Sequence, residues 1–409
     1  MTVKHLYPNS TPALNLNPKS SRVADPRLSC VRASVATYVD PVSGLVKTVQ
    51  DNVARVEKGG LLVEESRTNL LLQSTDFTTY WAKYNVTIDP NVETAPDGTT
   101  TASKMQWSSS SQRNCVFVAP TADVTKTHTC SFYAKAAEWN FAAVAMQPPG
   151  GGQPRYWITV DLTTGDVEEY SSGTSAPTQT DYHVTPLPNG WWRISATANV
   201  SSAGKTQVQM EVGMSPNNTF GYSVSGTPDG TSGIYIWGAQ EEQGTFLTSY
   251  IPTSGSTYQR LADEVSFLNN NLTSWYNNSQ GAFLIDINAL GSNGDYVRLM
   301  QTNQQHRFEY SQLSSSSGKA IHFSWLSGGT SRTPQGTAPL GEFKYAANYS
   351  IGNVSSICID GAETLRSSGN TAGTAAHTAP TELRLCRQSG NSQYLSSYVK
   401  RLVFYQAPI

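Results

Sequence analysis

The chain has 409 residues, only 14% of them are charged, and its formal net charge at pH 7 is −2. This balance argues against the basic surface that binds nucleic acid, so we expect no nucleic-acid partner. The 12 Phe, 9 Trp and 20 Tyr, together with 32 Gly, are typical of short strands joined by turns rather than of helical bundles.

The sequence has no run of eighteen apolar residues and no basic and apolar leader. We therefore expect a soluble product, without membrane insertion and without a standard signal peptide. Five cysteines without a Cys-x-x-Cys pair predict buried thiols in a reducing compartment. Disulfides between Cys115 and Cys130, across a hairpin, and between Cys358 and Cys386 remain open alternatives; the fifth cysteine is Cys30.

Residues 1–58 are predicted to form an extended N-terminal arm for assembly or attachment. Four prolines keep its first half extended: Pro8, Pro12, Pro18 and Pro26. Short strand-like pieces follow around a turn at residues 41–44. Such an arm has too little apolar surface for a core of its own. We expect it to dock onto another subunit or a scaffold, and a disordered leader is the alternative.

Residues 59–253 are predicted to form a first β-sandwich. At its start, Glu64-Glu65-Ser66-Arg67 interrupts two short apolar runs, which predicts a strand, a polar crossing and a second strand that enters the sandwich at Phe77 and Trp81. Turn signals then recur at residues 95–98, 149–152, 163–166, 188–190 and 228–230. Pro252 and the Ser-, Thr- and Gly-rich residues 253–257 mark the expected end of this domain.

Side chains alternate between two faces along the strands of this domain. In residues 156–162 and 191–196, the expected core face carries Tyr156, Ile158, Val160, Leu162, Trp192, Ile194 and Ala196. The opposite face carries Trp157, Thr159, Asp161, Trp191, Arg193 and Ser195.

Residues 254–409 are predicted to form a second sandwich. Its strands are expected to begin at residues 281–287 and to end at residues 398–405. Residues 355–361 are expected to form a strand that runs into a tight hairpin. The fold class expected for the whole chain is therefore all-β, with two sandwiches after the arm.

Several segments together resemble tailed-bacteriophage head-spike and tail-fibre structural proteins. The first is the run Gly60-Leu61-Leu62-Val63-Glu64-Glu65-Ser66-Arg67-Thr68-Asn69-Leu70. The others are Ala95-Pro96-Asp97-Gly98, Tyr133-Ala134-Lys135, Asn189-Gly190-Trp191-Trp192-Arg193, Gly238-Ala239-Gln240-Glu241 and Tyr250-Ile251-Pro252-Thr253. The last third resembles a concanavalin-like (laminin-G-like) sandwich. The resemblance covers most of the chain from about Asp25.

The resemblance implies a jelly roll similar to carbohydrate-binding modules over residues 59–253. It also implies a virion surface protein that is assembled in the host cytoplasm, forms a homotrimer, and contacts other phage head or tail proteins. Adhesion to host-surface polysaccharide is the expected activity. No cofactor is expected; a structural calcium built from scattered oxygens remains open by analogy with carbohydrate-binding modules.

Catalytic and metal-binding signals are weak. Adjacent carboxylates occur at residues 64–65, 168–169 and 241–242, but neighbours on a strand point to opposite faces, so none of these doublets is a catalytic pair. We expect them to be solvated or to lie between subunits, and we expect no enzyme. The six histidines lack metal-ligand spacing, and Asp97 and Asp229 are expected to form turns.

The aromatic residues opposite the core face give the best positive signal. Sugars stack on indole rings and need fixed polar groups around them, which Trp157 and Trp191 with Thr159, Asp161 and Arg193 would supply. The alternative is that the same face is buried against the arm, the second sandwich or another subunit. Two other functions also remain open, a decoration or cementing protein without a ligand and a glycan-degrading tail enzyme.

Overall fold

The computed structural model describes most of the chain. The described residues are 11–109, 113–173, 175–218, 227–277, 279–292, 296–302, 306–312, 319–327, 330–332, 335–337, 341–350, 356–360, 362–366, 380–387 and 394–407. The chain divides into two compact units. Unit 1 comprises Met1–Ser34, Gln50–Glu65 and Leu261–Ile409, and unit 2 comprises Val35–Val49 and Ser66–Arg260. Each unit is described by itself.

Unit 2 is a sandwich of two antiparallel sheets. Its elements are β3 (Ala36–Val39), β4 (Val46–Val49), β7 (Arg67–Asn69), β8 (Ala82–Tyr84), β9 (Val86–Glu93), β10 (Ala102–Trp107), β11 (Cys115–Val118), β12 (His128–Ala136), β13 (Phe141–Gln147), β14 (Arg155–Asp161), β15 (Val167–Ser172), β16 (Thr178–Pro186), η1 (Pro188–Gly190), β17 (Trp191–Asn199), β18 (Gln209–Ser215), β19 (Gly233–Gln243) and β20 (Tyr258–Arg260).

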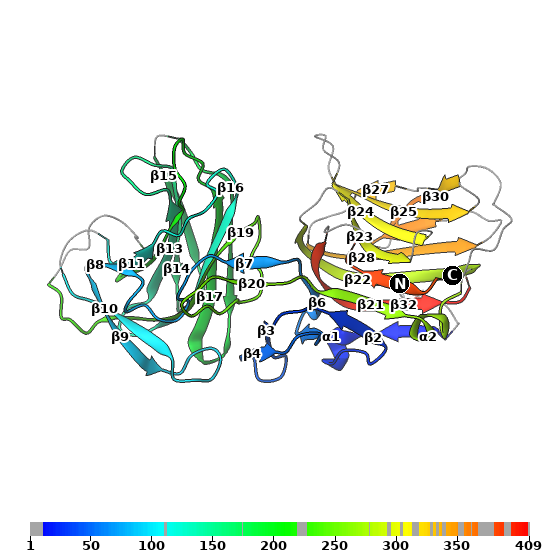
Figure 1. Ribbon diagram of the computed structural model, residues 1–409, viewed down its shortest axis with the longest axis horizontal. Helices are drawn as coiled ribbons and strands as arrows, with labels where there is room; N and C mark the ends of the chain where they lie inside the picture. The colour runs from blue at the N-terminus through cyan, green and yellow to red at the C-terminus, as the bar shows by residue number, and fades with distance from the viewer. Residues whose placement is uncertain are drawn as a thin grey trace, which may run out of the picture. The chain divides into compact units, whose positions relative to one another are not determined.

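Among the described residues, β8 to β19 form two six-stranded sheets (Figure 1). The first, sheet F, has the order β15-β14-β13-β18-β11-β8, and the second, sheet G, has the order β16-β17-β12-β19-β10-β9. Tyr156 and Val212 from sheet F pack with Ile194 and Ile236 from sheet G in one buried cluster. β3 and β4 form a separate hairpin, and β7 pairs with β20.

Unit 1 is also built from two antiparallel sheets. Its elements are β1 (Leu14–Leu16), α1 (Pro18–Ser21), β2 (Leu28–Val31), β5 (Arg55–Glu57), β6 (Gly60–Val63), β21 (Glu264–Leu268), α2 (Asn270–Thr273), β22 (Gln280–Ser292), β23 (Tyr296–Thr302), β24 (His306–Gln312), β25 (Lys319–Ser327), β26 (Thr330–Arg332), β27 (Gln335–Thr337), β28 (Gly341–Ser350), β29 (Ser356–Ile359), β30 (Ala362–Arg366), β31 (Glu382–Leu385) and β32 (Leu395–Tyr405).

One sheet of unit 1 has the order β30-β29-β28-β22-β32-β6-β5, with β1 also pairing with β32. The other has the order β2-β21-β31-β23-β24-β25-β26, with β27 pairing with β25. Leu61, Phe283 and Phe404 from the first sheet pack with Phe267 and Leu385 from the second in one core. The hydrophobic side chains of the two sheets thus close a second sandwich.

The all-β class predicted from the sequence is confirmed, and so are the predicted side-chain faces. The seven residues assigned to the core face all lie in, or pack against, the buried cluster between sheets F and G. Phe77 and Trp81 enter the same cluster, as the crossing at residues 64–67 predicts. The hairpin predicted near residue 360 is formed by β29 and β30, although Ser355 and Gly361 lie outside the described residues.

Residues 11–58 do not form the extended arm that the sequence predicts. β1 pairs with β32, β2 with β21, and β5 with β6, so most of this segment completes the sheets of unit 1. Leu14 and Leu16 are buried in the core of that unit. Residues 35–49 instead belong to unit 2. The apolar residues of the segment therefore pack within the chain, which offsets the ordering entropy without a partner.

The domain boundaries also differ from the prediction, which divided the chain into three consecutive segments. The chain passes between the units after Ser34, Val49, Glu65 and Arg260, so both units are discontinuous in sequence. The strand at residues 60–63 belongs to unit 1, whereas residues 254–260 belong to unit 2. Antiparallel pairing explains this arrangement, because β6 and β20 lie beside strands that are distant in sequence.

Candidate functional site

The outer face of sheet F carries a row of residues that crosses five strands. Phe117 on β11 is opposite Glu211 on β18, which is opposite Ala145 on β13. Ala145 is opposite Trp157 on β14, which is opposite Tyr170 on β15. In the adjacent row, Gln147 on β13 is opposite Gln209 on β18, and Arg155 on β14 is opposite Ser172 on β15.

The side chains of this adjacent row line a pocket of about 470 Å³, here called the Glu211 pocket. Its lining residues are Tyr84, Arg113, Cys115, Phe117, Gln147, Gly150, Gly151, Gly152, Gln153, Arg155, Ser172, Gly173 and Gln209. Tyr84 is 40% exposed, so its ring is available to a ligand. Burial raises the pKa of the Cys115 thiol, which is therefore no reactive thiolate here.

The carboxylate of Glu211 holds the polar side chains of the pocket in place. It is fully buried, and its Oε1 accepts hydrogen bonds from Arg113 Nη1 at 2.7 Å, Gln147 Nε2 at 3.0 Å and Gln209 Nε2 at 2.9 Å. Its Oε2 accepts from Arg155 Nη2 at 2.9 Å. A buried carboxylate with two guanidinium and two amide donors is fully satisfied, so it fixes those groups rather than reacting.

Trp157 supports the pocket instead of lining it. The Arg155 guanidinium carbon lies 4.7 Å from the centroid of the indole ring, and the Tyr170 ring stacks on the indole at 5.3 Å. These neighbours leave Trp157 only 9% exposed. Its Nε1 and the Oγ1 of buried Thr159 have no hydrogen-bond partner among the described residues.

The side chain of Asp161 stabilises a turn. Its Oδ1 accepts hydrogen bonds from the backbone N–H of Thr163 at 2.8 Å and from the Thr163 hydroxyl at 2.6 Å. Its backbone carbonyl accepts a hydrogen bond of 2.7 Å from the N–H of Gly165, a residue with φ +83°. Asp161 therefore closes the hairpin between β14 and β15 and is not placed to bind a sugar.

Trp191 and Arg193 lie on the other sheet. β17 belongs to sheet G, and Trp191 packs there with Val46, Tyr133 and Trp237 in a separate cluster on the outer face. Trp191 is 1% exposed, and Val46 belongs to the β3–β4 hairpin. The Arg193 guanidinium carbon lies 5.3 Å from the centroid of the Tyr133 ring.

The five residues predicted as a glycan site therefore do not form one site. Trp157, Thr159 and Asp161 lie on sheet F, and Trp191 and Arg193 lie on sheet G. Alternation along the sequence predicts which face of a strand a side chain occupies, but not the sheet to which the strand belongs. The residues of the Glu211 pocket were not identified from the sequence: Tyr84, Arg113, Phe117, Gln147, Gln209 and Glu211. The same alternation contained a signal for them, because Met210, Val212 and Met214 point into the core and leave Gln209, Glu211 and Gly213 outside.

The carboxylate doublets are not all solvated or between subunits. Glu64, Glu65, Glu241 and Glu242 are buried inside the chain, and only Glu168 and Glu169 are exposed, so the prediction was wrong for two of the three doublets. Glu242, for example, accepts hydrogen bonds from the backbone N–H of Thr248 at 2.9 Å and from its hydroxyl at 2.6 Å. Local donors thus replace water around Glu242, whereas neither carboxyl oxygen of Glu241 has a hydrogen-bond partner among the described residues.

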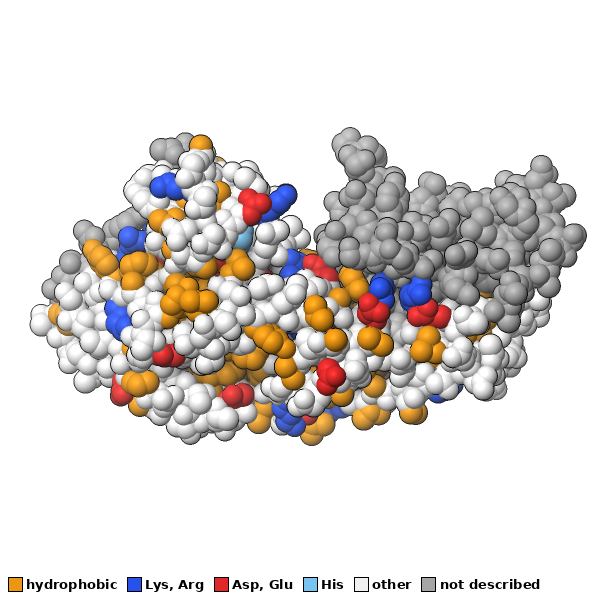
Figure 2. Space-filling view, in the orientation of Figure 1, with side chains coloured by type: hydrophobic (Ala, Val, Ile, Leu, Met, Phe, Trp, Pro, Cys, Tyr) orange, Lys and Arg blue, Asp and Glu red, His pale blue; other side chains and the backbone are white. Residues whose placement is uncertain are grey.

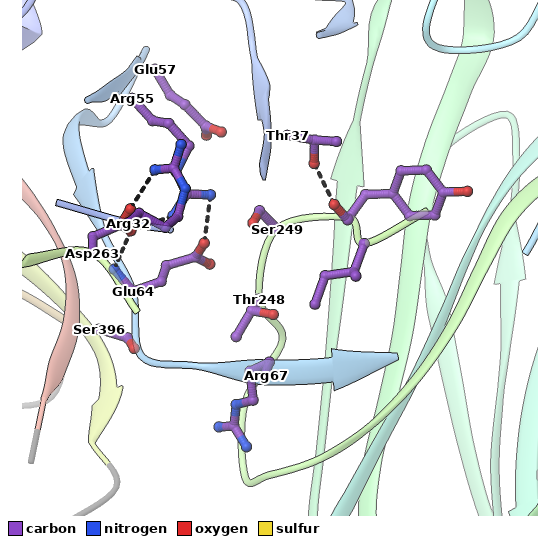
Figure 3. Close-up of polar contacts among 12 residues, drawn as sticks. Arg32, Thr37, Arg55, Glu57, Glu64, Arg67, Thr248, Ser249, Asp263 and Ser396 are labelled. Atoms are coloured by element: carbon purple, nitrogen blue, oxygen red, sulfur yellow. Dashed lines mark hydrogen bonds and ion pairs between the residues drawn. The ribbon is translucent and has the colours of Figure 1, made fainter. Parts of the chain in front are cut away.

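A cluster of buried charged side chains in unit 1 includes Glu64, the first carboxylate of the doublet at residues 64–65 (Figure 3). Asp263 Oδ1 lies 2.7 Å from Arg32 Nη1, and Asp263 also pairs with Arg55. Arg55 Nη1 lies 2.8 Å from Glu64 Oε2. The backbone N–H of Glu64 donates to Asp263 Oδ2 at 2.9 Å, which ties β6 to the start of β21. These charged residues have a structural role in unit 1.

The other predicted polar features are as follows. Asp97 and Asp229 form turns, as predicted, by accepting backbone N–H hydrogen bonds from Thr99 and Thr231. All five cysteines are free, and Cys115 and Cys130 lie on different sheets, so the two disulfide alternatives are not formed.

The described residues include no group of three or more His, Cys, Asp or Glu side chains placed to hold a metal, and a calcium built from other oxygens stays a prediction. No helix in the described part of the chain is long and apolar enough to cross a membrane. On the face drawn in Figure 2, charged side chains of both signs are scattered among uncharged ones.

No family model and no curated protein matches the chain. Among solved structures, a Trypanosoma rangeli sialidase in complex with sialic acid is similar at 10% identity and a TM-score of 0.28, over 75% of this chain and 59% of that chain. Domains LG4-5 of the mouse laminin α1 chain are similar at 10% identity and a TM-score of 0.25, over 84% and 89%. The chain spans 59% of that sialidase's length, and at these TM-scores neither likeness bears on function.

Proposed function

We propose that the chain is a structural surface protein of a tailed-phage particle, a head spike or tail fibre, that binds host-surface glycans through the Glu211 pocket. The phage part rests on the ordered series of segments from residue 60 to residue 253. The virion surface is then its location, and a homotrimer its assembly. Attachment is not assigned to residues 11–58, because their strands pair within the chain.

The observation that carries the glycan part is the composition of the Glu211 pocket. Tyr84 and Phe117 present aromatic surface, while Arg113, Gln147 and Gln209 are fixed by one buried carboxylate. Sugars need this combination, since their C–H faces stack on rings and their hydroxyls pair with fixed donors and acceptors. A shallow pocket gives weak binding per site, and several copies on one particle compensate by avidity.

The test is glycan-array binding by the purified chain and by Tyr84→Ala, with Tyr182→Ala as the matched control. Tyr182 is also 40% exposed but lies on β16 of sheet G. We expect the wild type and Tyr182→Ala to bind the same glycans and Tyr84→Ala to lose them. Immunogold labelling of purified particles tests the location. Absence of label from particles whose genome encodes the chain would refute the virion assignment.

A decoration protein without a ligand is the second candidate. It is favoured by the burial of Trp157 and Trp191, which removes both indoles as open stacking surfaces. In that case the array shows no binding while the particles are labelled. Loss of the chain would then lower the thermal or osmotic stability of the particles without changing their adsorption to host cells.

A further inference from the structure

The charged groups around the Glu211 pocket are unequal in number. Arg113 and Arg155 both line it, and among the described lining residues none is acidic. Glu211 behind them supplies one negative charge against two positive ones. Lys205 adds a third cation at the rim, where its Nζ donates to the carbonyl of Pro149 at 2.7 Å beside Gly150. The pocket therefore carries an excess of positive charge.

The remaining carboxylates on this face do not balance that excess. Asp161 accepts a hydrogen bond from Thr163 in the turn. Glu168, on the edge strand β15, accepts hydrogen bonds from the side chains of Tyr170 and Asn218. Neither residue lines the pocket. In a chain whose formal net charge is −2, this local excess is a property of the pocket and not of the whole surface.

The geometry leaves one cation accessible beside an aromatic ring. The side chain of Arg113 is 24% exposed, and its guanidinium carbon lies 5.9 Å from the centroid of the Tyr84 ring. Arg155 is buried and held by Glu211. A planar guanidinium favours carboxylates, which it can bind through two parallel N–H groups. A sugar ring on Tyr84 would bring a carboxylate substituent next to Arg113.

From these observations we infer that the Glu211 pocket selects acidic glycans, in which a sugar ring carries a carboxylate that pairs with Arg113 while the ring packs against Tyr84 and Phe117. This inference rests on the proposed glycan-binding function and adds the ligand class. Gly151 at the rim leaves the approach open, since among the described residues, its chain neighbours aside, no atom lies within 4 Å of the position that a Cβ at Gly151 would occupy.

The experiment uses an array in which each carboxylate-bearing oligosaccharide, including tetragalacturonate and a hyaluronan tetrasaccharide, stands beside its methyl ester and beside neutral glycans. We expect the full chain to bind free acids about tenfold or more tightly than the esters, because a hydrogen bond to a charged group is stronger than one to a neutral group. The preference should shrink as salt is raised from low to high concentration. The ester comparison needs no variant, so misfolding cannot obscure it.

Two variants then assign the effect to Arg113. Arg113→Gln should lose the preference for acids while keeping the binding of esters, and Arg113→Lys should keep part of the preference. Circular dichroism of each variant checks the fold. Equal binding of acids and esters by the wild type, or an unchanged preference in Arg113→Gln, overturns the inference but leaves glycan binding intact. Binding to no glycan at all overturns the proposed glycan function itself.

Discussion

The indole Nε1 of Trp191 donates a hydrogen bond of 3.0 Å to the backbone carbonyl oxygen of Thr94. The same ring packs with Val46 of the β3–β4 hairpin, and the backbone N–H of Val46 donates to the carbonyl of Pro96 at 2.9 Å. A segment far away in the sequence thus covers the outer face of sheet G. Trp191 is a core residue of unit 2, although strand alternation assigns it to the outside.

We therefore expect substitutions at Trp191 to change stability and not glycan binding. Trp191→Ala should lower the free energy of unfolding by roughly 3–5 kcal/mol, the usual cost of emptying a large aromatic site. Trp191→Phe should cost about 1 kcal/mol, since it chiefly removes the hydrogen bond to Thr94. Denaturant unfolding followed by circular dichroism gives both values.

Tyr84→Ala is the matched comparison for this prediction. Because Tyr84 is 40% exposed, its loss should change stability little and binding strongly. If Trp191→Phe abolished glycan binding at unchanged stability, Trp191 would belong to a binding site and the assignment to the core would fail.

Strand alternation predicted the face of each side chain because the two-residue period depends only on local geometry. It could not predict the sheet, because β14, which carries Trp157, pairs with its neighbour β13, whereas β17, which carries Trp191, pairs with β12 far away in the sequence. The Glu211 pocket was missed for the same reason. Arg113, Arg155 and Glu211 belong to three segments that only the order of sheet F brings together.

The predicted arm shows a related limit. Four prolines and few apolar residues do indicate an extended chain, but an extended chain is also what an added strand requires. Leu14 and Leu16 alternate around Asn15, and this short pattern fits a strand that borrows its core from β32. Composition gives the local conformation of such a segment, whereas its partner depends on the rest of the fold.

Glu241 should make the stability of unit 2 depend on pH. The side chain is fully buried, and burial raises the pKa of its carboxyl well above the usual value. The folded chain then keeps a proton that the unfolded chain loses above about pH 4.3. Stability is therefore lost as the pH rises above that value. Each unit of pKa shift is equivalent to about 1.4 kcal/mol.

We expect Glu241→Gln to raise the melting temperature at pH 7.5 and to change it little at pH 4, where the carboxyl is protonated in both states. The neighbouring group is His128, whose Nδ1 lies 3.6 Å from Glu241 Oε1 and whose pKa burial lowers. His128 therefore destabilises the fold on the acid side, below about pH 6.5, in wild type and variant alike. An equal change in melting temperature at both pH values would show that Glu241 does not titrate as described.

Asp263 should be essential to unit 1. It pairs with Arg32 and Arg55, all three side chains are buried, and its removal leaves two buried cations without their shared partner. Asp263→Asn should cost roughly 3–5 kcal/mol, as breaking a buried ion pair does. Thermal and denaturant unfolding measure the loss.

The control for Asp263 is the Glu382–Arg384 pair on β31 of the same unit. Both of its side chains are 22% exposed. Glu382→Gln should cost less than about 1 kcal/mol, because water screens such a pair. Similar losses for the two variants would mean that the buried cluster gives no more stability than a surface pair.

Glycine should be required at position 238 because of a close contact and not only because of its backbone angle. It has φ +60°, and a Cβ at this position would lie 2.8 Å from Tyr133 Cδ2. Gly190 has φ +78°, but apart from its chain neighbours no atom in the described part of the chain lies within 4 Å of the position that its Cβ would occupy. Gly190→Ala should therefore cost only the backbone term, about 1 kcal/mol.

Gly238→Ala should cost clearly more than Gly190→Ala, because it must also displace the Tyr133 ring, which packs against Trp237 and Tyr250 at centroid distances of 5.2 and 5.8 Å. The two unfolding free energies, measured side by side, separate the contact from the backbone strain. A further variant, Tyr133→Leu, should relieve part of the Gly238→Ala defect, since it removes the ring that the new methyl group meets. Equal losses for the two glycine variants, with no relief by Tyr133→Leu, would mean that the left-handed backbone alone requires glycine at position 238.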